Sequence, residues 1–315
     1  MENDKRNFVK IIYEICLEQG ISIESFSYDW IFCLRSNNGK FGYIFGYQFG
    51  LNSASVHSIC CDKCAASDVM TSLDIPNVEH FFFMSPSNQK YIKHNGNWNA
   101  MIALLNKYGK IVCKPNDGTG GNQVFLVSNQ YELEKTVYTL FEDNRAIAIS
   151  PYYDINNEYR VIVLEGAIRL IYSKQRPYVI GDGKKTLFEL LRDYLTKNST
   201  IKILTEGSII GFDLKSIPLE NEKVYLNWKH NLGQGAMAVI ENDGENADKI
   251  KKIVELIINK MNVNFASIDI VECDGNLRVL EINSGVMMEH FSKQNERTYK
   301  IAKQIYKDAI LSMLR

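Results

Sequence analysis

Apolar residues recur every three or four positions in six stretches of the chain, which predicts six helices. These stretches cover residues 8–16, 65–73, 98–108, 186–194, 250–261 and 298–314. Gly20 follows the first stretch and Gly109 follows the third, where glycine is a typical end of a helix.

Short runs rich in aliphatic and aromatic residues predict strands between these helices. They cover residues 30–34, 43–47, 79–84, 111–114, 123–127, 146–149, 159–164, 167–172, 265–272 and 277–283. Asn37-Asn38-Gly39 and Glu165-Gly166 are turn signals between neighbouring runs. The fold class indicated is therefore mixed α/β (α+β), while residues 197–227 are too weakly patterned to assign.

Composition narrows the functional class. The 315 residues carry a formal net charge of −1, whereas a dedicated nucleic-acid binder is expected to be clearly basic. Charged residues at 23% and hydrophobic residues at 45% are ordinary for a globular protein and argue against disorder. No apolar run approaches the roughly 18 residues that a membrane helix needs, and the polar start MENDKRNFVK does not resemble a signal peptide.

Seven scattered cysteines favour a reducing, cytoplasmic compartment, because a secreted disulfide framework is denser and usually even in number. Cys61 and Cys64 have the spacing of a metal or redox pair, but no second Cys or His pair accompanies them at zinc spacing. We interpret them as ordinary free thiols.

The hairpin at residues 265–283 holds Asp269, Glu281 and Asn283, three side chains with oxygen ligands of the kind that Mg²⁺ takes. Glu281 and Asn283 share a face because they are two apart on a strand. Asp269 joins that face only if it pairs with Glu281, a register that also sets Ile268 against Ile282 and Ile270 against Leu280. The alternative is a solvated polar face without a ligand.

A two-residue Asp-Gly turn would instead pair Asp269 with Leu280 and disrupt both faces of the hairpin. We therefore predict a three-residue loop or a bulge at residues 274–276.

A second candidate site is the glycine-rich segment at residues 116–122, which follows Lys114-Pro115. Its three glycines allow backbone N–H groups to approach an anion closely, and the lysine supplies a point charge for phosphate. The order of residues is neither that of a Walker loop nor that of a Rossmann fingerprint. A glycine-rich hairpin with no ligand is the alternative.

The order of these motifs resembles the ATP-grasp superfamily of carboxylate–amine ligases over about residues 60–292. The motifs are Asp62-Lys63, Asp74-Ile75-Pro76, Lys114-Pro115 with the glycine segment, Glu158-Tyr159-Arg160, and Asp269 with Glu281 and Asn283. Residues 174–186 and Asn231-Leu232-Gly233-Gln234-Gly235 look like the cyanophycin synthetase and glutamate-ligase group within it. The resemblance implies an ATP-grasp fold, with an N-terminal domain at 1–61 and two nucleotide-clasping lobes at 62–147 and 148–315.

The resemblance also implies a role for each matching residue. Lys63 and Lys114 would contact the nucleotide phosphates, and Gly118, Thr119, Gly120 and Gly121 would close over them. Ser150, Tyr152 and Tyr153 would form the adenine hinge, which lacks the usual acidic residue, and Glu158 would hold the ribose. Asp269, Glu281 and Asn283 would bind Mg²⁺, and Arg176, Arg160 and Asn231 would meet the γ-phosphate, the acyl-phosphate or the substrate.

The residues themselves leave structural alternatives for several of these groups. Arg160 could be a paired charge within a strand, and His230 is more typical of packing than of catalysis. Glu289 and His290 follow the metal residues and could line the substrate site or simply pack; here Ser284-Gly285-Val286 stands where the family often has Ser-Pro-Gly.

The implied cofactors are ATP and two Mg²⁺ ions, for which Mn²⁺ could substitute. The implied reaction joins a carboxylate, as its acyl-phosphate, to an amine of an amino-acid or peptide substrate. An ATP-grasp kinase and a non-catalytic nucleotide-binding module are the alternatives. Nucleic-acid and membrane partners are not expected, and the sequence leaves the oligomeric state open, although dimers are frequent in the superfamily.

Overall fold

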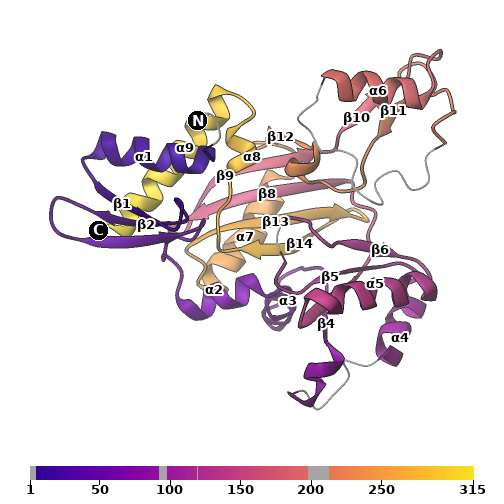
Figure 1. The fold of residues 1–315 in the computed structure, drawn as a ribbon, viewed down its shortest axis with the longest axis horizontal. Helices are drawn as coiled ribbons and strands as arrows, with labels where there is room; N and C mark the ends of the chain where they lie inside the picture. Colours follow the sequence, from indigo (N-terminus) through magenta and orange to yellow (C-terminus); the bar gives the residue numbers. More distant parts are fainter. Residues whose placement is uncertain (1–4, 92–97, 119, 198–212) are drawn as a thin grey trace. The chain divides into compact units, whose positions relative to one another are not determined.

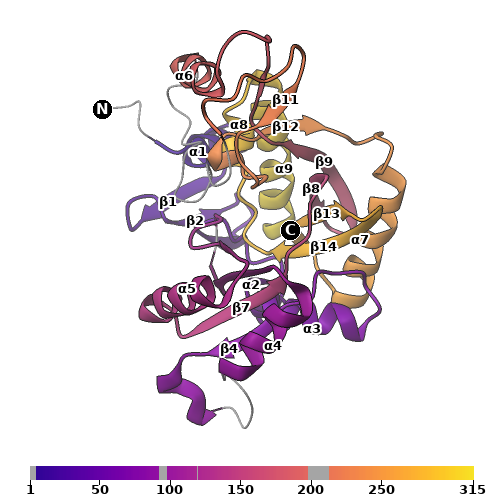
Figure 2. The ribbon, with the colours of Figure 1, turned by 90° about the vertical axis from the view of Figure 1, so that its right-hand side faces the viewer.

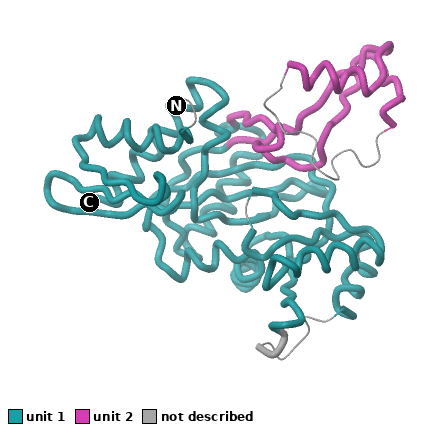
Figure 3. The backbone as a smooth tube through the Cα atoms, in the orientation of Figure 1, with its two compact units in different colours: residues 1–171, 241–315 teal, residues 172–240 magenta. Residues whose placement is uncertain are grey.

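The computed structural model describes residues 5–91, 98–118, 120–197 and 213–315. The chain divides into two compact units, residues 1–171 with 241–315 and residues 172–240 (Figure 3). The first unit contains three sheets or parts of sheets and most of the helices. The second unit is small and is described separately below.

The N-terminal part of the first unit is a helix on a three-stranded antiparallel sheet (Figure 1). Helix α1 (Asn7–Gln19) ends at Gly20, which adopts the left-handed conformation that favours glycine. The sheet has the order β1 (Ser22–Phe26), β2 (Ile31–Arg35), β3 (Phe41–Phe45). Phe8, Phe32 and Tyr306 are among the large buried side chains of this core.

A four-stranded antiparallel sheet follows, in the order β4 (Phe81–Met84), β7 (Ala146–Pro151), β5 (Ile111–Pro115), β6 (Phe125–Val127). The 3-10 helix Pro86–Tyr91 follows β4. Helices α4 (Trp98–Tyr108) and α5 (Gln130–Asp143) bury their apolar sides in one core with this sheet. The sequence pattern predicted no helix over α5, because its apolar stripe is narrow: only Leu133, Val137 and Leu140 among its large apolar side chains are buried.

The central sheet has the order β12 (Met237–Ile240), β9 (Ala167–Gln175), β8 (Asn157–Leu164), β13 (Phe265–Cys273), β14 (Asn276–Asn283). Figures 1 and 2 show α7 (Ala247–Met261) along one face of β8, β13 and β14. Side chains of α2 (Ala54–Cys61) and α3 (Lys63–Ser72) join the same core. The chain closes with α8 (Glu289–Ser292) and α9 (Glu296–Met313).

The second unit begins inside β9. Its residues 172–175 pair with β12, and β10 (Tyr178–Ile180) pairs with β11 (Lys223–Tyr225). Helix α6 (Leu187–Lys197) packs on the second pair through a small core of Val179, Leu187, Leu191 and Leu226. The 3-10 helix Leu232–Gln234 precedes β12.

The hairpin of β13 and β14 confirms part of the predicted register and corrects the rest. Asp269 pairs with Glu281 and Ile268 with Ile282, as predicted, but Ile270 pairs with Val279. The turn is a two-residue turn, in which Asp274 and Gly275 both have positive φ (51° and 72°). The predicted bulge is therefore not at the turn: the register shifts between Asp269 and Ile270, so that Leu280 is the extra residue.

Most of the predicted helices and strands are present, with ends displaced by a few residues. The division into compact units does not test the three lobes expected at 1–61, 62–147 and 148–315, and these stay a prediction. No helix within the described ranges combines the length and the apolar character needed to cross a membrane.

Candidate active site

A row of charged side chains crosses the central sheet. Asp269 on β13 pairs with Arg160 on β8 on one side and with Glu281 on β14 on the other. Ile268, Ile270 and Ile282 belong to the core beneath α7. Because side chains alternate along a strand, Arg160, Asp269 and Glu281 lie on the opposite face. We call these three residues the polar row.

Arg160 and Asp269 form a two-pronged ion pair. Nε of Arg160 donates to Oδ1 of Asp269 and Nη2 donates to Oδ2, both at 2.7 Å. The Asp269 side chain is 2% exposed, so the guanidinium supplies the compensation that a buried carboxylate requires. This geometry supports the paired-charge interpretation of Arg160.

Glu281 and Asn283 contact each other at the end of β14, where Nδ2 of Asn283 donates to Oε1 of Glu281 at 3.1 Å. Within the described ranges, no group of three or more His, Cys, Asp and Glu residues is arranged to hold a metal ion. The predicted metal ligands Asp269, Glu281 and Asn283 are not a group of this kind, because one of the three is an amide. Their donors fit a hard cation such as Mg²⁺, since all three side chains offer oxygen from one face of the hairpin.

Lys114, on β5, is the buried cation of the site, with 6% of its surface exposed. Burial lowers its pKa to about 8, while the Glu281 carboxylate acts in the opposite direction and Lys63 adds to the lowering. Glu281, a member of the polar row, therefore acts on Lys114 electrostatically. An anion that binds together with a metal cation suits this arrangement, because the ammonium of Lys114 can pair with the anion and the carboxylates can pair with the cation.

Lys63 ties the start of α3 to the glycine segment. Its Nζ donates to the backbone oxygens of Asn116 and Gly118. The Asn116 side chain accepts from the backbone N–H of Cys64 at 3.1 Å, and its carbonyl accepts from the N–H of Lys63 at 3.2 Å. Asn116, to which no separate role was assigned from the sequence, therefore joins the start of α3 to the glycine segment.

The glycine segment turns where glycine is needed. Gly120 and Gly121 have positive φ, and a side chain at Gly118 would approach Cβ of Pro115 to 2.9 Å. Thr119, also predicted to contact phosphate, lies outside the described residues. The positions of the described glycines are compatible with the predicted loop and do not test its role.

The predicted hinge lies at the end of β7 and beyond. Ser150 is buried within β7, and the backbone N–H of Tyr152 donates to Lys110 O. The Tyr153 hydroxyl accepts from Nη1 of Arg278 at 2.8 Å. Glu158, the predicted ribose ligand, is buried on the same face of β8 as Arg160 and acts to raise the pKa of Lys114.

Arg176 and Asn231 belong to the second unit. The Arg176 guanidinium lies over the Tyr225 ring, 4.1 Å from its centroid. The Asn231 side chain caps the 3-10 helix Leu232–Gln234 by accepting from Gly233 N. His230 is buried and its Nδ1–H donates to Lys174 O at 2.8 Å, which supports the packing interpretation. Lys174 is a second buried lysine, to which sequence analysis assigned no role.

His80 is a buried polar residue that sequence analysis missed. Its Nδ1 lies 2.8 Å from Val78 O and must donate to it, which leaves the lone pair on Nε2 as an acceptor. No donor to Nε2 is present in the part of the chain that the structure describes. Burial lowers the pKa of His80 well below the usual value, and the charges of Lys114 and Lys63 lower it further. The signal for this residue, a lone His within the predicted strand 79–84, is too weak to read from sequence.

Glu289 and His290, which follow the predicted metal residues, have different surroundings. Glu289 is buried and accepts from the backbone N–H groups of Asn7 and Phe8, at 2.8 and 3.0 Å. It therefore caps α1, whose own N-cap residue makes no such bond. His290 is exposed; partial burial of its ring lowers its pKa, and Lys293 and Arg160 lower it further.

Among the residues that the structure describes, no cysteine belongs to a metal-binding group or a catalytic pair. All seven are free thiols, and burial raises the pKa of Cys60 and Cys64 to about 12. The exposed Cys61 sulfur lies 3.8 and 3.7 Å from Nδ1 and Nε2 of His57. Near-equal distances to both ring nitrogens do not match a thiol directed at one nitrogen lone pair.

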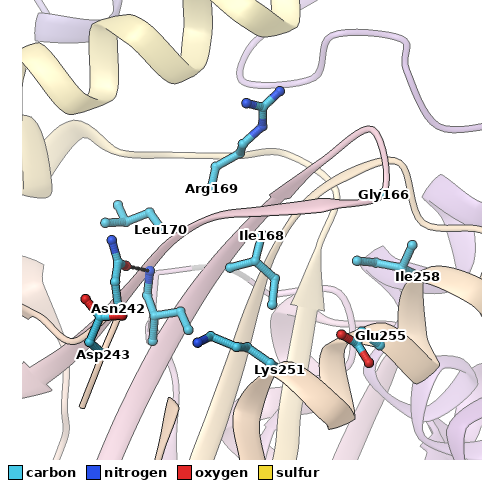
Figure 4. A pocket seen from close by; sticks show the side chains of 10 residues that line it. Gly166, Ile168, Arg169, Leu170, Asn242, Asp243, Lys251, Glu255 and Ile258 are labelled. Atoms are coloured by element: carbon cyan, nitrogen blue, oxygen red, sulfur yellow. Dashed lines mark hydrogen bonds between the residues drawn. The ribbon is translucent and has the colours of Figure 1, made fainter. Parts of the chain in front are cut away.

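A groove of about 410 Å³ lies on the α7 side of the sheet, away from the face of the polar row (Figure 4). Its walls come from β9, α7 and the segment between β12 and α7. The Asn242 amide oxygen accepts from the backbone N–H of Ile171 at 2.7 Å. Figure 4 shows Lys251, Glu255 and Ile258 following one another along α7, with Asn242 and Asp243 at the other end of the groove. Its mixed charges do not define a ligand, and it plays no part in the site described above.

Comparison with known proteins gives the class first: the chain has the ATP-grasp fold. A bifunctional glutathione synthetase from Pasteurella multocida superposes on 97% of this chain and 44% of its own, with a TM-score of 0.55 and 17% identity. A D-alanine–D-alanine ligase from Bacillus anthracis matches 85% of this chain and 68% of its own, with a TM-score of 0.52 and 17% identity. The predicted fold is confirmed.

Sequence comparison with curated proteins shows which proteins this chain resembles. Cyanophycin synthetase from a Synechocystis strain is 27% identical over 196 residues, which are 57% of this chain and 22% of the relative. The chain thus spans about a fifth of the length of that relative. No model of a known protein family matches the chain. The expected resemblance to the cyanophycin synthetase group is confirmed, and the roles of individual residues stay predictions.

Proposed function

We propose that this chain is an ATP-dependent ligase that joins a carboxylate to an amine through an acyl-phosphate. The observation that carries the proposal is a row of oxygen ligands on β13 and β14 of an ATP-grasp scaffold, in which Glu281 acts electrostatically on the buried Lys114. Its curated relatives are synthetases, which supports the same reaction class. Amino acids and peptides are the proposed substrates.

Each group has a proposed task. Lys63, Lys114 and the glycine segment bind the triphosphate, residues 150–153 and Glu158 bind the nucleoside, and Arg176 and Asn231 contact the substrate or acyl-phosphate. Asp269, Glu281 and Asn283 would hold Mg²⁺, which when bound neutralises charge on the phosphates. Because Arg160 binds both oxygens of Asp269, we now assign it to positioning that carboxylate. This chemistry depends on position and charge, so no nucleophilic side chain is required.

ADP release tests the proposal, measured over a panel of amino acids and peptides with and without an added amine. Lys114→Ala and Glu281→Ala should each lower turnover by about two orders of magnitude or more and leave the circular dichroism spectrum unchanged. Glu255→Ala, which removes a carboxylate from the groove on the opposite face, is the matched control and should retain activity. Full turnover in either test variant would contradict the assignment.

Hydroxylamine distinguishes a ligase from a kinase. A ligase that forms an acyl-phosphate yields a hydroxamate when hydroxylamine replaces the amine, because hydroxylamine attacks the activated acyl carbon. A kinase that phosphorylates a stable hydroxyl yields ADP but no hydroxamate, and a non-catalytic module yields neither while still binding nucleotide.

A further inference from the structure

The outer face of the N-terminal sheet is an exposed aromatic surface. The register aligns three rows across β1, β2 and β3, which are Phe26–Ile31–Phe45, Glu24–Cys33–Tyr43 and Ser22–Arg35–Phe41. Phe32, Leu34 and Ile44 alternate with these residues and are fully buried, so they face the core. Cys33, the central residue of the nine, is only 3% exposed, so the exposed rings surround a buried centre. We call the nine residues of the three rows the outer lattice.

The rings of the outer lattice are open to solvent to an unusual degree. Phe41, Tyr43 and Phe45 are 56%, 55% and 52% exposed, and Phe26 is 47% exposed. At about 200 Å² for each aromatic side chain, the four rings expose on the order of 400 Å². That area lies within the range of the largest apolar patches on soluble monomers, which are often interaction sites.

We propose that this surface binds the same surface of a second copy of the chain, in a two-fold symmetric dimer. Two patches together bury about 800 Å² of aromatic surface, and the polar positions around them bring the contact to roughly the 1,000 Å² that a specific interface requires. A two-fold interface must be complementary to itself. The outer lattice satisfies this condition in one arrangement in particular.

That arrangement crosses the strands of the two sheets at about 90°, one of the two ways in which sheets pack face to face. One diagonal of the outer lattice passes through Phe45, Cys33 and Ser22. If the two-fold axis runs along this diagonal, Glu24 of each copy faces Arg35 of the other copy. The same axis sets Phe26 against Phe41 and Ile31 against Tyr43. Arrangements with the axis along or across the strands instead place Arg35 against Arg35 or Glu24 against Glu24, which like charges disfavour.

The mass of the full chain in solution tests the dimer, by light scattering and sedimentation over a concentration series. The wild type should reach twice the chain mass of 36.1 kDa. Tyr43→Glu and Phe45→Glu should each stay monomeric and keep the wild-type circular dichroism spectrum, since both positions are exposed. Tyr131→Glu and Tyr138→Glu are matched controls on α5, where the rings are 75% and 71% exposed, and should remain dimeric.

A mixing experiment tests the two-fold arrangement itself. Glu24→Arg and Arg35→Glu should each be monomeric alone, because each places like charges against each other in both symmetric contacts. An equimolar mixture should form a heterodimer, in which both contacts pair Arg with Glu.

A monomeric wild type at about 100 µM, a dimer that survives Tyr43→Glu, or a mixture that stays monomeric would overturn the proposal. Monomers that bind lipid vesicles through the same rings would overturn it as well. The outcome is independent of ligase activity, which the dimer variants should retain under the proposed function.

Discussion

Arg160 holds both carboxylate oxygens of Asp269 at 2.7 Å across two neighbouring strands. The pair is mostly buried, so each charge depends on the other for compensation. We predict that Arg160→Ala lowers the free energy of unfolding by about 3 kcal/mol or more, since it leaves the carboxylate buried and uncompensated. Urea unfolding of the single variants and of the double variant with Asp269→Asn gives the coupling energy.

The Arg315–Glu165 pair is the control for that measurement. Its arginine side chain is 70% exposed, although the Nη1–Oε1 distance is 2.8 Å. Solvent screens such a pair, so Arg315→Ala should cost less than about 1 kcal/mol. If Arg160→Ala and Arg315→Ala lower the free energy of unfolding equally, the distinction between a buried and an exposed ion pair is wrong.

Lys114 should take up a proton when nucleotide binds. Burial lowers its pKa to about 8, and phosphate oxygens favour the charged form and raise the pKa again. At pH 8 the free protein is therefore about half protonated at this residue, and binding should take up about half a proton. Calorimetric binding enthalpies in buffers of different ionisation enthalpy measure the uptake. Lys114→Arg should show none.

The same lowered pKa implies that Lys114 destabilises the folded protein at neutral pH. The penalty is fully present below the folded pKa of about 8 and fades as the pH rises toward the ordinary value of 10.5. A difference of this size corresponds to about 3 kcal/mol. We expect Lys114→Met to raise the melting temperature at pH 7, with a smaller gain at pH 10, while it abolishes turnover. A loss of stability at pH 7 would indicate that the ammonium is already compensated.

His80 should make the protein sensitive to mild acid. Burial lowers its folded pKa well below 6.5, so the unfolded state binds the proton first. Stability that is present above pH 6.5 is then lost as the pH falls toward the folded pKa, by up to about 1.4 kcal/mol per pH unit. Unfolding of the wild type and His80→Gln between pH 5 and 7 should show the steeper slope in the wild type. The pKa of His290 is also lowered, but less than that of His80, so His290→Gln should remove a smaller part of the slope.

Glu289 should stabilise α1 from a distance of more than 280 residues along the chain. Burial acts to raise the pKa of Glu289, but bonds from Lys293, Phe8 and Asn7 outweigh it and the pKa is lowered. This contribution is present above the ordinary carboxyl pKa and is lost as the pH falls through the lowered value. Glu289→Ala should therefore cost about 1 kcal/mol at pH 7 and speed hydrogen exchange at the first turn of α1. Glu296→Ala, at an exposed carboxylate of α9, is the control.

Sequence patterns predicted the part of the polar row on β13 and β14, because alternation along a strand gives each residue only two faces, but they did not place Arg160 opposite Asp269. The pairing of Asp269 with Glu281 followed from the need to keep Ile268 and Ile282 on one apolar face. The position of the bulge did not follow, since a bulge at Leu280 or at the turn satisfies the same alternation. Only the backbone, with positive φ at both Asp274 and Gly275, distinguishes the two.

Other features were beyond the reach of local patterns because their partners are remote in sequence. Glu289 could be placed near the metal residues, but nothing in its neighbours indicates that it caps a helix at Asn7. The charge of Lys114 lowers the pKa of His80, and Asn116 bonds to the start of α3. Both partners are remote in sequence and come close only in the folded chain. Helix α5 was missed for a different reason, since most of its surface is polar and its buried stripe is narrow.

Because Leu280 is an extra residue in the ladder, the number of positions between Asp269 and Glu281 along the chain does not determine whether the two residues pair. The ladder is regular on each side of Leu280, so a chain without this residue would still set the equivalents of Asp269 and Glu281 opposite each other. Twelve positions separate the two in this sequence, and a plain hairpin needs only eleven. A search pattern with a rigid gap between the acids would therefore overlook relatives with the same pairing, whereas one that aligns strands and lets the gap vary would find them.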